Sequence, residues 1–320
     1  MRAIQIIAPG NAQVVDVPVP QVKDDEVLVK VKSCVTCPHW DITLFRGVDI
    51  FERPGFPKYP IPAGYPGHEM AGEVTAVGKK VKAFKVGDRV ATIIAGGEDR
   101  MGFYCEFINR PASTVVKVPK GISDDAAASM EMSRYVSAFV RLLGDVSGKR
   151  TGVTGVGPAG LIALQMLKAL GAREVVAVDM LDDRLALAKK LGATETVNAG
   201  TDQIKRLESA PLQASVDCSG IASGLQTALD HTRGSISIFG VPHGDIKYGI
   251  RHWGRNLLSS GNPTADDTAF VLKLWRAGKL DTGALVSARL PFEKYADGIQ
   301  RLMARKAVKI AYCPEGPWSA

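Results

Sequence analysis

The chain has 320 residues, of which 46% are hydrophobic and 23% charged, and this composition excludes a disordered chain, a collagen and a coiled coil. Forty basic residues against 33 acidic ones give a net charge of +7. Because the basic residues form no long run, no nucleic-acid partner is predicted, although an anionic cofactor or substrate suits this charge.

A short apolar stretch at the start of the chain ends at Pro9 and Gly10. Neither a signal peptide nor a membrane span is therefore expected. Five cysteines are an odd number in a chain too long to need disulfides, which favours a reducing compartment and predicts a cytoplasmic protein. At about 150 residues per domain, the length predicts two domains with a cleft between them.

The first 120 or so residues are rich in β-branched side chains punctuated by glycine and proline. Val27, Val29 and Val31 alternate with Leu28, Lys30 and Lys32, and residues 73–77 and 86–93 have the same strand character. The pattern predicts a mostly β domain whose long loops, such as 40–65, carry side chains toward another part of the molecule.

From about Lys149 short apolar strands alternate with periodic helices. The predicted strands are 151–154, 174–178, 194–197, 215–218, 235–239 and 256–260, and the predicted helices include 158–170 and 182–191. Such alternation indicates βαβ units, a parallel sheet and helices on both of its faces.

Residues 285–291 and 308–312 return to strand character around a helix near 293–303. A chain that runs from β to α/β and back to β predicts that its C-terminus rejoins the first domain. The predicted domains are 1–124 with 285–320, and 125–284.

The strand ending at Thr154 runs into a G-x-G-x-x-G turn and then directly into an apolar helix. Gly155 allows the tight turn, Gly157 lets the backbone approach a pyrophosphate, and Gly160 lets the helix pack against the strand. The helix N-terminus presents N–H groups to the phosphates. We predict cofactor contacts at Gly155, Gly157, Pro158, Ala159 and Gly160.

Asp179 ends the next predicted strand, about 20 residues after the last glycine, where a carboxylate binds the adenosine ribose hydroxyls. Such a carboxylate repels a 2′-phosphate, so NAD(H) is predicted over NADP(H). Met180 follows it in the cofactor region. Arg184 either reaches toward the cofactor, where it could meet a 2′-phosphate, or lies on the helix surface.

Cys34 and Cys37 form a C-x-x-C, which fits a redox pair or half of a zinc site. No second C-x-x-C exists, so a four-cysteine structural zinc is excluded. A catalytic zinc needs three protein ligands and an open position. The candidate ligands are Cys37, His68 in Gly-His-Glu, and Glu131, while Cys34 is expected to be a small buried side chain.

Together, the β domain, the Cys37 segment, the Gly-His-Glu motif, Glu131 and the glycine turn resemble the zinc-dependent medium-chain dehydrogenase/reductase family over nearly the whole chain. Glu131 in place of a third cysteine is similar to the polyol and sugar dehydrogenase branch. The resemblance implies a GroES-like catalytic β-barrel domain and a Rossmann domain. It also implies that Cys37, His68 and Glu131 bind Zn²⁺, with catalytic Glu69 in or beside the ligand shell.

The same resemblance implies hydride transfer between NAD and a secondary alcohol, with a polyol, sugar or cyclitol favoured as the small-molecule substrate. Zinc makes the alcohol more acidic. Gly240 and Val241 would lie along the nicotinamide, and Lys309 would reach the pyrophosphate unless it is a surface lysine. Relatives of this kind are commonly homodimers or homotetramers.

The chain departs from the family pattern in three places. The hydroxyl that starts a proton relay is missing after Cys37, and His39 is either its replacement or a polar wall of the pocket. The four-cysteine lobe is also missing, which predicts one zinc per chain. Met132 replaces the usual proline after Glu131, and Glu69 is the substitute ligand if Glu131 is not one.

Trp40, Phe45 and Trp253 could line a substrate pocket, although aromatic residues more often lie in the core. Two other functions stay open. A zinc-free NAD(P)H reductase of quinones or enones would hold no metal at the candidate ligands, and a dinucleotide-binding protein without catalysis would use the fold alone.

Overall fold

The computed structural model describes residues 1–49, 53–94, 101–259 and 261–316. The chain divides into two compact units, of which the first comprises Met1–Glu131 with Thr282–Ala320 and the second Met132–Asp281. The C-terminal segment thus belongs with the N-terminal one. The first unit ends at Glu131 and resumes at Thr282, whereas the predicted borders are at 124 and 285.

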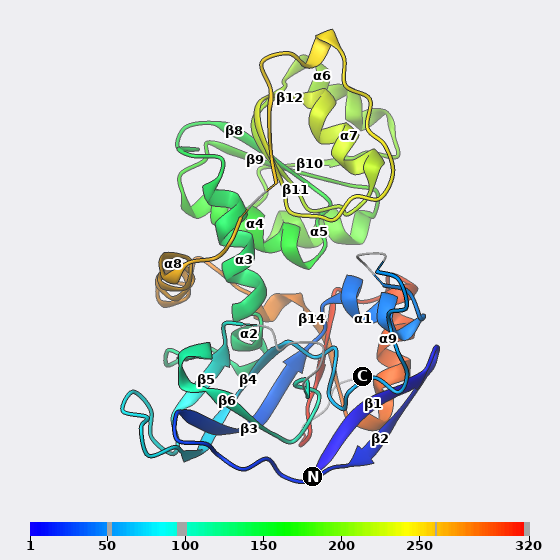
Figure 1. Cartoon of the computed structure of the whole chain (residues 1–320). Coiled ribbons are helices and arrows are strands. Elements are labelled where there is room, and N and C mark those ends of the chain that lie inside the picture. Colours follow the sequence, from blue (N-terminus) through cyan, green and yellow to red (C-terminus); the bar gives the residue numbers. More distant parts are fainter. Residues whose placement is uncertain (50–52, 95–100, 260, 317–320) are drawn as a thin grey trace. The chain divides into compact units, whose positions relative to one another are not determined.

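The first unit is mainly β structure (Figure 1). Its strands are β1 (Arg2–Ala8), β2 (Asn11–Asp16), β3 (Glu26–Val35), β4 (Glu69–Val77), β5 (Arg89–Thr92), β6 (Phe107–Pro111), β7 (Val115–Lys117), β14 (Val286–Leu290) and β15 (Lys309–Tyr312). Its helices are α1 (Pro38–Phe45), α2 (Asp124–Ala128) and α9 (Tyr295–Met303). The main sheet has the order β14-β15-β3-β4-β5-β7, with β6 also paired to β3, while β1 and β2 pair separately.

The core of this unit follows the predicted alternation of β3. Val27, Val29 and Val31 are at most 1% exposed and pack in one apolar cluster with Ile310 and Tyr312 of the C-terminal strand. β15 runs antiparallel to the end of β3. The last strand of the chain therefore completes the sheet beside the segment that carries Cys37.

The predicted long loop over 40–65 is wrong at its start, because α1 extends through Phe45. Pro38 fits the first turn of a helix, where its missing N–H costs no hydrogen bond. The side chains of Leu44 and Phe45 are buried in the core. Tertiary burial thus stabilises a helix too short for its periodicity to be recognised in the sequence. Residues 50–52 of the loop lie outside the described residues.

The second unit holds a parallel sheet with the order β10-β9-β8-β11-β12-β13, which confirms the predicted α/β fold. Its strands are β8 (Arg150–Thr154), β9 (Glu174–Asp179), β10 (Glu195–Asn198), β11 (Leu212–Asp217), β12 (Thr232–Ile238) and β13 (Asn256–Leu258). The helices are α3 (Met130–Arg141), which begins in the first unit, α4 (Pro158–Ala169), α5 (Asp182–Lys190), α6 (Arg206–Ser209), α7 (Ala222–His231) and α8 (Ala265–Arg276). No helix in the described ranges is long and apolar enough to cross a membrane.

The strand order reverses direction beside β8. From β8 the chain adds β9 and β10 on one side and then β11, β12 and β13 on the other. In open α/β sheets, ligands bind at the carboxyl ends of the strands that flank such a reversal. The carboxyl ends of β8 and β11 are therefore the expected cofactor position in this unit.

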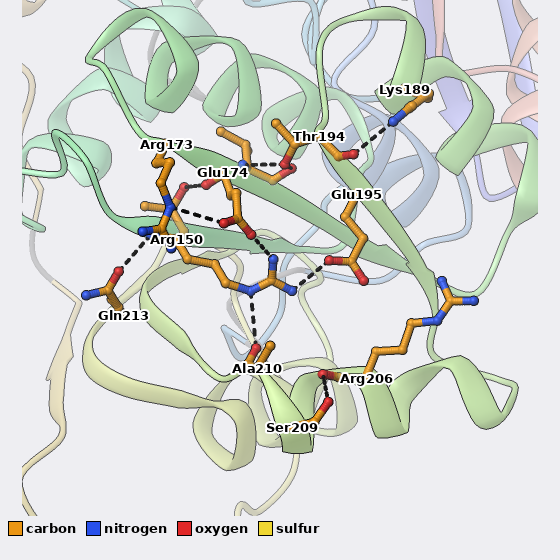
Figure 2. A network of polar contacts seen from close by, with 12 residues as sticks. Arg150, Arg173, Glu174, Lys189, Thr194, Glu195, Arg206, Ser209, Ala210 and Gln213 are labelled. Atoms are coloured by element: carbon orange, nitrogen blue, oxygen red, sulfur yellow. Dashed lines mark hydrogen bonds and ion pairs between the residues drawn. The ribbon is translucent and has the colours of Figure 1, made fainter.

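An ion-pair network ties the starts of three strands together, away from that position (Figure 2). The guanidinium of Arg150, at the start of β8, binds Glu174 of β9, Glu195 of β10 at 2.7 Å and the carbonyl of Ala210 at 3.2 Å. The Arg150 side chain is only 10% exposed. This network supports the sheet rather than the chemistry.

Candidate functional site

Three metal-ligand side chains converge in the first unit. The thiol of Cys37, the imidazole of His68 and the carboxylate of Glu69 have ligand atoms that all lie within 4.8 Å of one another. The register explains the convergence, because Val35 at the end of β3 pairs with Glu69 at the start of β4. These atoms are close enough to share one ion, and thiolate, imidazole and carboxylate are the donor set of catalytic zinc.

His68 is oriented by its backbone neighbour. Its Nδ1 lies 2.8 Å from the carbonyl oxygen of Pro66, so an Nδ1–H donates to that oxygen and Nε2 is left as the ligand atom. Burial opposes a charged imidazole, but the hydrogen bond with Cys37 and the charges of Cys37, Glu131 and Glu69 raise the pKa of His68 well above its usual range. The acidic groups around His68 thus favour a positive charge at this position.

Glu69 is bound on both of its carboxylate oxygens by one lysine. Lys309 Nζ lies 2.7 Å from Oε1 and 2.6 Å from Oε2, and it also donates to the carbonyl of Thr36 at 2.9 Å. Both side chains are fully buried. The alternative that Lys309 is a surface lysine is therefore wrong. Glu69 Oε1 lies 4.0 Å from His68 Nε2, which places this ion pair beside the candidate metal.

Glu131 lies in the first turn of α3 and is only 6% exposed. Its charge helps to raise the pKa of His68, so the two residues interact. Its carboxylate is not among the three converging ligand atoms found in the described residues. Glu131 stays a predicted ligand, and Glu69 is the carboxylate that converges with Cys37 and His68.

Asp41 fixes the backbone of Cys37 by a hydrogen bond. It was not among the site residues predicted from the sequence. Its buried carboxylate accepts hydrogen bonds from the N–H of Cys37 at 2.9 Å, the hydroxyl of Tyr104 at 2.7 Å and that of Tyr295 at 3.0 Å. Burial raises the pKa of Asp41 to about 6, even though these bonds favour its charged form. The one signal in the sequence was an acidic residue in the first turn after Cys37.

Trp40 packs on the candidate ligand His68, with ring centroids 5.4 Å apart. Its indole N–H donates to the hydroxyl of Tyr65 at 3.1 Å, which fixes the ring. His39 lies in the same helical turn and is partly exposed. Phe45 is 2% exposed and lies in the core, which decides between the two positions left open for it by the sequence.

The glycine turn of the second unit has the geometry of a phosphate cradle. Gly155 has a φ of +77°, and a Cβ there would lie 2.5 Å from the Cα of Ser219. A Cβ on Gly160 would lie 2.0 Å from the carbonyl oxygen of Gly155. Around Gly157, in contrast, no atom lies within 4 Å of the Cβ position, so its backbone is open to a ligand. The residues therefore fit a dinucleotide pyrophosphate at the start of α4.

Asp179 ends β9, as predicted, and its carboxylate is fixed beside this turn. One oxygen accepts the N–H of Val156 at 2.8 Å, and the other accepts those of Met180 and Leu181 at 2.7 and 3.0 Å. Arg184 of α5 interacts electrostatically with Asp179. These residues lie together in the second unit.

The loop after β12 approaches the loop after β11. A Cβ on Gly240 would lie 2.5 Å from the backbone nitrogen of Gly220. Val241 follows in the same loop and is partly exposed. Both residues stay predicted nicotinamide contacts.

Two family models match this chain. Residues 23–120 match an alcohol dehydrogenase GroES-like domain, and residues 158–263 match a zinc-binding dehydrogenase. The L-threonine 3-dehydrogenase of Cronobacter sakazakii is 28% identical, over 97% of this chain and 98% of the relative.

Solved structures show the same fold. An Escherichia coli oxidoreductase/dehydrogenase of unknown specificity has a TM-score of 0.87 at 25% identity, covering 98% of each chain. The galactitol-1-phosphate dehydrogenase of Escherichia coli has a TM-score of 0.85 at 24% identity, covering 98% of this chain and 100% of that one.

Proposed function

Because this chain belongs to the zinc-dependent medium-chain dehydrogenase/reductase family, we propose that it transfers a hydride between NAD and a secondary alcohol of a polyol, sugar or cyclitol. The observation that carries the proposal is the convergence of Cys37, His68 and Glu69, whose ligand atoms all lie within 4.8 Å of one another. Zinc, when bound, supplies a Lewis acid that makes the alcohol hydroxyl more acidic. A zinc-free reductase would not need this donor set.

Different residues of this chain would bind the metal, position its ligands and bind the cofactor. Cys37 and His68 would hold the metal, with Glu131 or Glu69 as the third ligand. Asp41 would position Cys37 through its N–H, and Trp40 would hold the His68 ring in place. The open backbone at Gly157 would take the cofactor pyrophosphate.

The substrate class is tested by rates with NAD on a panel of pentitols, hexitols, aldoses, inositols, 2-butanol, benzyl alcohol and L-threonine. We expect the highest kcat/KM among the hydroxyl-rich compounds, because Glu131 in place of a third cysteine resembles the polyol and sugar dehydrogenase branch. L-threonine is in the panel because it is the substrate named for similar enzymes. Activity confined to hydrophobic alcohols, or to threonine, would contradict the proposed class.

Asp179 predicts a preference for NAD over NADP. The Asp179→Asn variant keeps an oxygen for the N–H of Val156 but removes the charge that repels a 2′-phosphate. Since like charges placed together cost several kcal/mol, we expect the ratio of kcat/KM for NADP to that for NAD to rise at least about tenfold. Steady-state kinetics with both cofactors measure this ratio. A wild type that prefers NADP would contradict the proposed role of Asp179.

We also propose His39 as the proton acceptor that replaces the missing relay hydroxyl. General-base groups contribute roughly 100- to 10,000-fold to rate. The His39→Gln variant should therefore lower kcat at least about a hundredfold and flatten the pH profile near neutrality, while His231→Gln, at the end of α7, should leave both unchanged. An unaltered kcat and pH profile in His39→Gln would contradict the proton-acceptor role and favour the alternative that His39 is a polar wall of the pocket.

A homodimer or homotetramer in the cytoplasm is proposed as the working form. Ile250 and Trp253, just before the edge strand β13, are 77% and 73% exposed, and apolar side chains of this size favour burial against a partner. The five free cysteines suit a reducing compartment. Light scattering gives the assembly, and a monomer at micromolar concentration would contradict it.

A further inference from the structure

Asp217 is a buried carboxylate in the second unit to which the proposed chemistry gives no role. It ends β11 and is 0% exposed. Its Oδ1 accepts hydrogen bonds from the hydroxyls of Thr154 and Ser219, each at 2.7 Å, and from the N–H of Ser219 at 3.3 Å. Among the described residues, Oδ2 is buried without a hydrogen-bond partner. A half-satisfied buried carboxylate costs stability and calls for a reason.

The position of Asp217 supplies that reason. Thr154 and Asp217 lie opposite each other in the parallel pair of β8 and β11, where the strand order reverses. Thr154 directly precedes the turn at Gly155. One carboxylate oxygen therefore joins the residue before the glycine turn to Ser219 in the next loop, at the edge where dinucleotides bind.

The loop that Asp217 holds has little room to move. A Cβ on Gly155 would lie 2.5 Å from the Cα of Ser219, and one on Gly224 would lie 2.2 Å from the Ser219 hydroxyl oxygen. A Cβ on Gly240 would lie 2.5 Å from the backbone nitrogen of Gly220. Gly155 and Gly240 thus let loops from different strands pack on backbone atoms, while Gly224 leaves room for the Ser219 side chain. A small shift of Ser219 would therefore reach the turn.

We propose that Asp217 is a positioning residue for the nicotinamide cofactor, which acts by holding Thr154 and Ser219 so that the turn at Gly155 keeps its phosphate-binding shape. The inference rests on NAD being the cofactor. It assigns Asp217 no contact with substrate. Loss of the hydrogen bonds from Thr154 and Ser219 to Asp217 should therefore raise the Kd of the cofactor. It should leave kcat at saturating cofactor nearly unchanged.

The test uses the full-length, zinc-loaded protein and the fluorescence of bound NADH. We expect Asp217→Asn and Ser219→Ala to raise the Kd of NADH and the KM of NAD about tenfold, with kcat within about twofold of the wild type. Ser215→Ala is the matched control, because that hydroxyl lies on the same strand and bonds to Thr232 at 2.8 Å. It should lower the melting temperature without changing the Kd.

The outcomes separate this inference from the proposed function. If the wild type does not bind NADH, the cofactor assignment fails and the role of Asp217 fails with it. If the wild type binds NADH and both variants bind it equally well, only the positioning role is overturned. Should Asp217→Asn not fold, Ser219→Ala and Thr154→Val decide the matter by the same Kd measurement.

Discussion

Replacing Cys37 with serine should leave the protein without bound zinc and lower turnover at least about a hundredfold. Cys37 contributes the thiol of the converging donor set, and a serine hydroxyl is a far poorer zinc ligand than a thiolate. Loss of a residue that only supports a ligand already costs about 10- to 100-fold in affinity or activity, so loss of the ligand itself should cost more. Elemental analysis and steady-state rates measure both effects.

Cys34→Ala is the matched control, because Cys34 lies in the same C-x-x-C, is fully buried and is outside the donor group. It should keep one zinc per chain. Glu131→Gln and Glu69→Gln then identify the third ligand by which of them loses the metal. Zinc retained in Cys37→Ser, or two zinc ions in the wild type, would contradict the proposed site.

Replacing Lys309 with methionine should lower the free energy of unfolding by about 3 to 5 kcal/mol, the cost of leaving one member of a buried ion pair without its partner. Lys309 and Glu69 are both fully buried, and Lys309 binds both carboxylate oxygens. Methionine matches the length of the lysine stem but offers no charge. For a unit of this size the loss corresponds to a fall in melting temperature of roughly 10 °C, measured by calorimetry.

Lys294→Met is the control, because its ion pair with Asp297 joins side chains that are more than half exposed, and such pairs contribute about 0 to 1 kcal/mol. The double variant Glu69→Gln with Lys309→Met should recover part of the loss, since no buried charge is left unpaired. Equal stability of Lys309→Met and Lys294→Met would contradict the importance of the buried pair.

The glycine turn and Asp179 were predictable because their signals are local. A strand, a turn with spaced glycines and a helix follow one another directly in the chain, and each glycine answers a steric demand within a few residues. Asp179 was found from its spacing, and the structure places its carboxylate on the N–H of Val156. The parallel sheet followed from the alternation of strands and helices in the same way.

Asp41 could not be assigned in advance because its partners are remote in the chain. Tyr104 and Tyr295 donate to its carboxylate. The residues near Asp41 in the sequence do not predict a contact with two tyrosines from distant segments. The position of Phe45 was left open for a related reason. An aromatic ring can line a pocket or lie in the core, and only packing against Tyr295 shows that Phe45 lies in the core.

By itself, the sequence determined the order of β and α/β segments, the glycine turn between a strand and a helix, and the residue types able to hold zinc. Tertiary structure alone decided that Glu69 is bound to Lys309, that Asp41 supports Cys37 and that Asp217 joins two loops. The physical reason is burial. Polar groups removed from water must find partners wherever the fold brings them together, and sequence spacing carries no record of partners that are far apart in the chain.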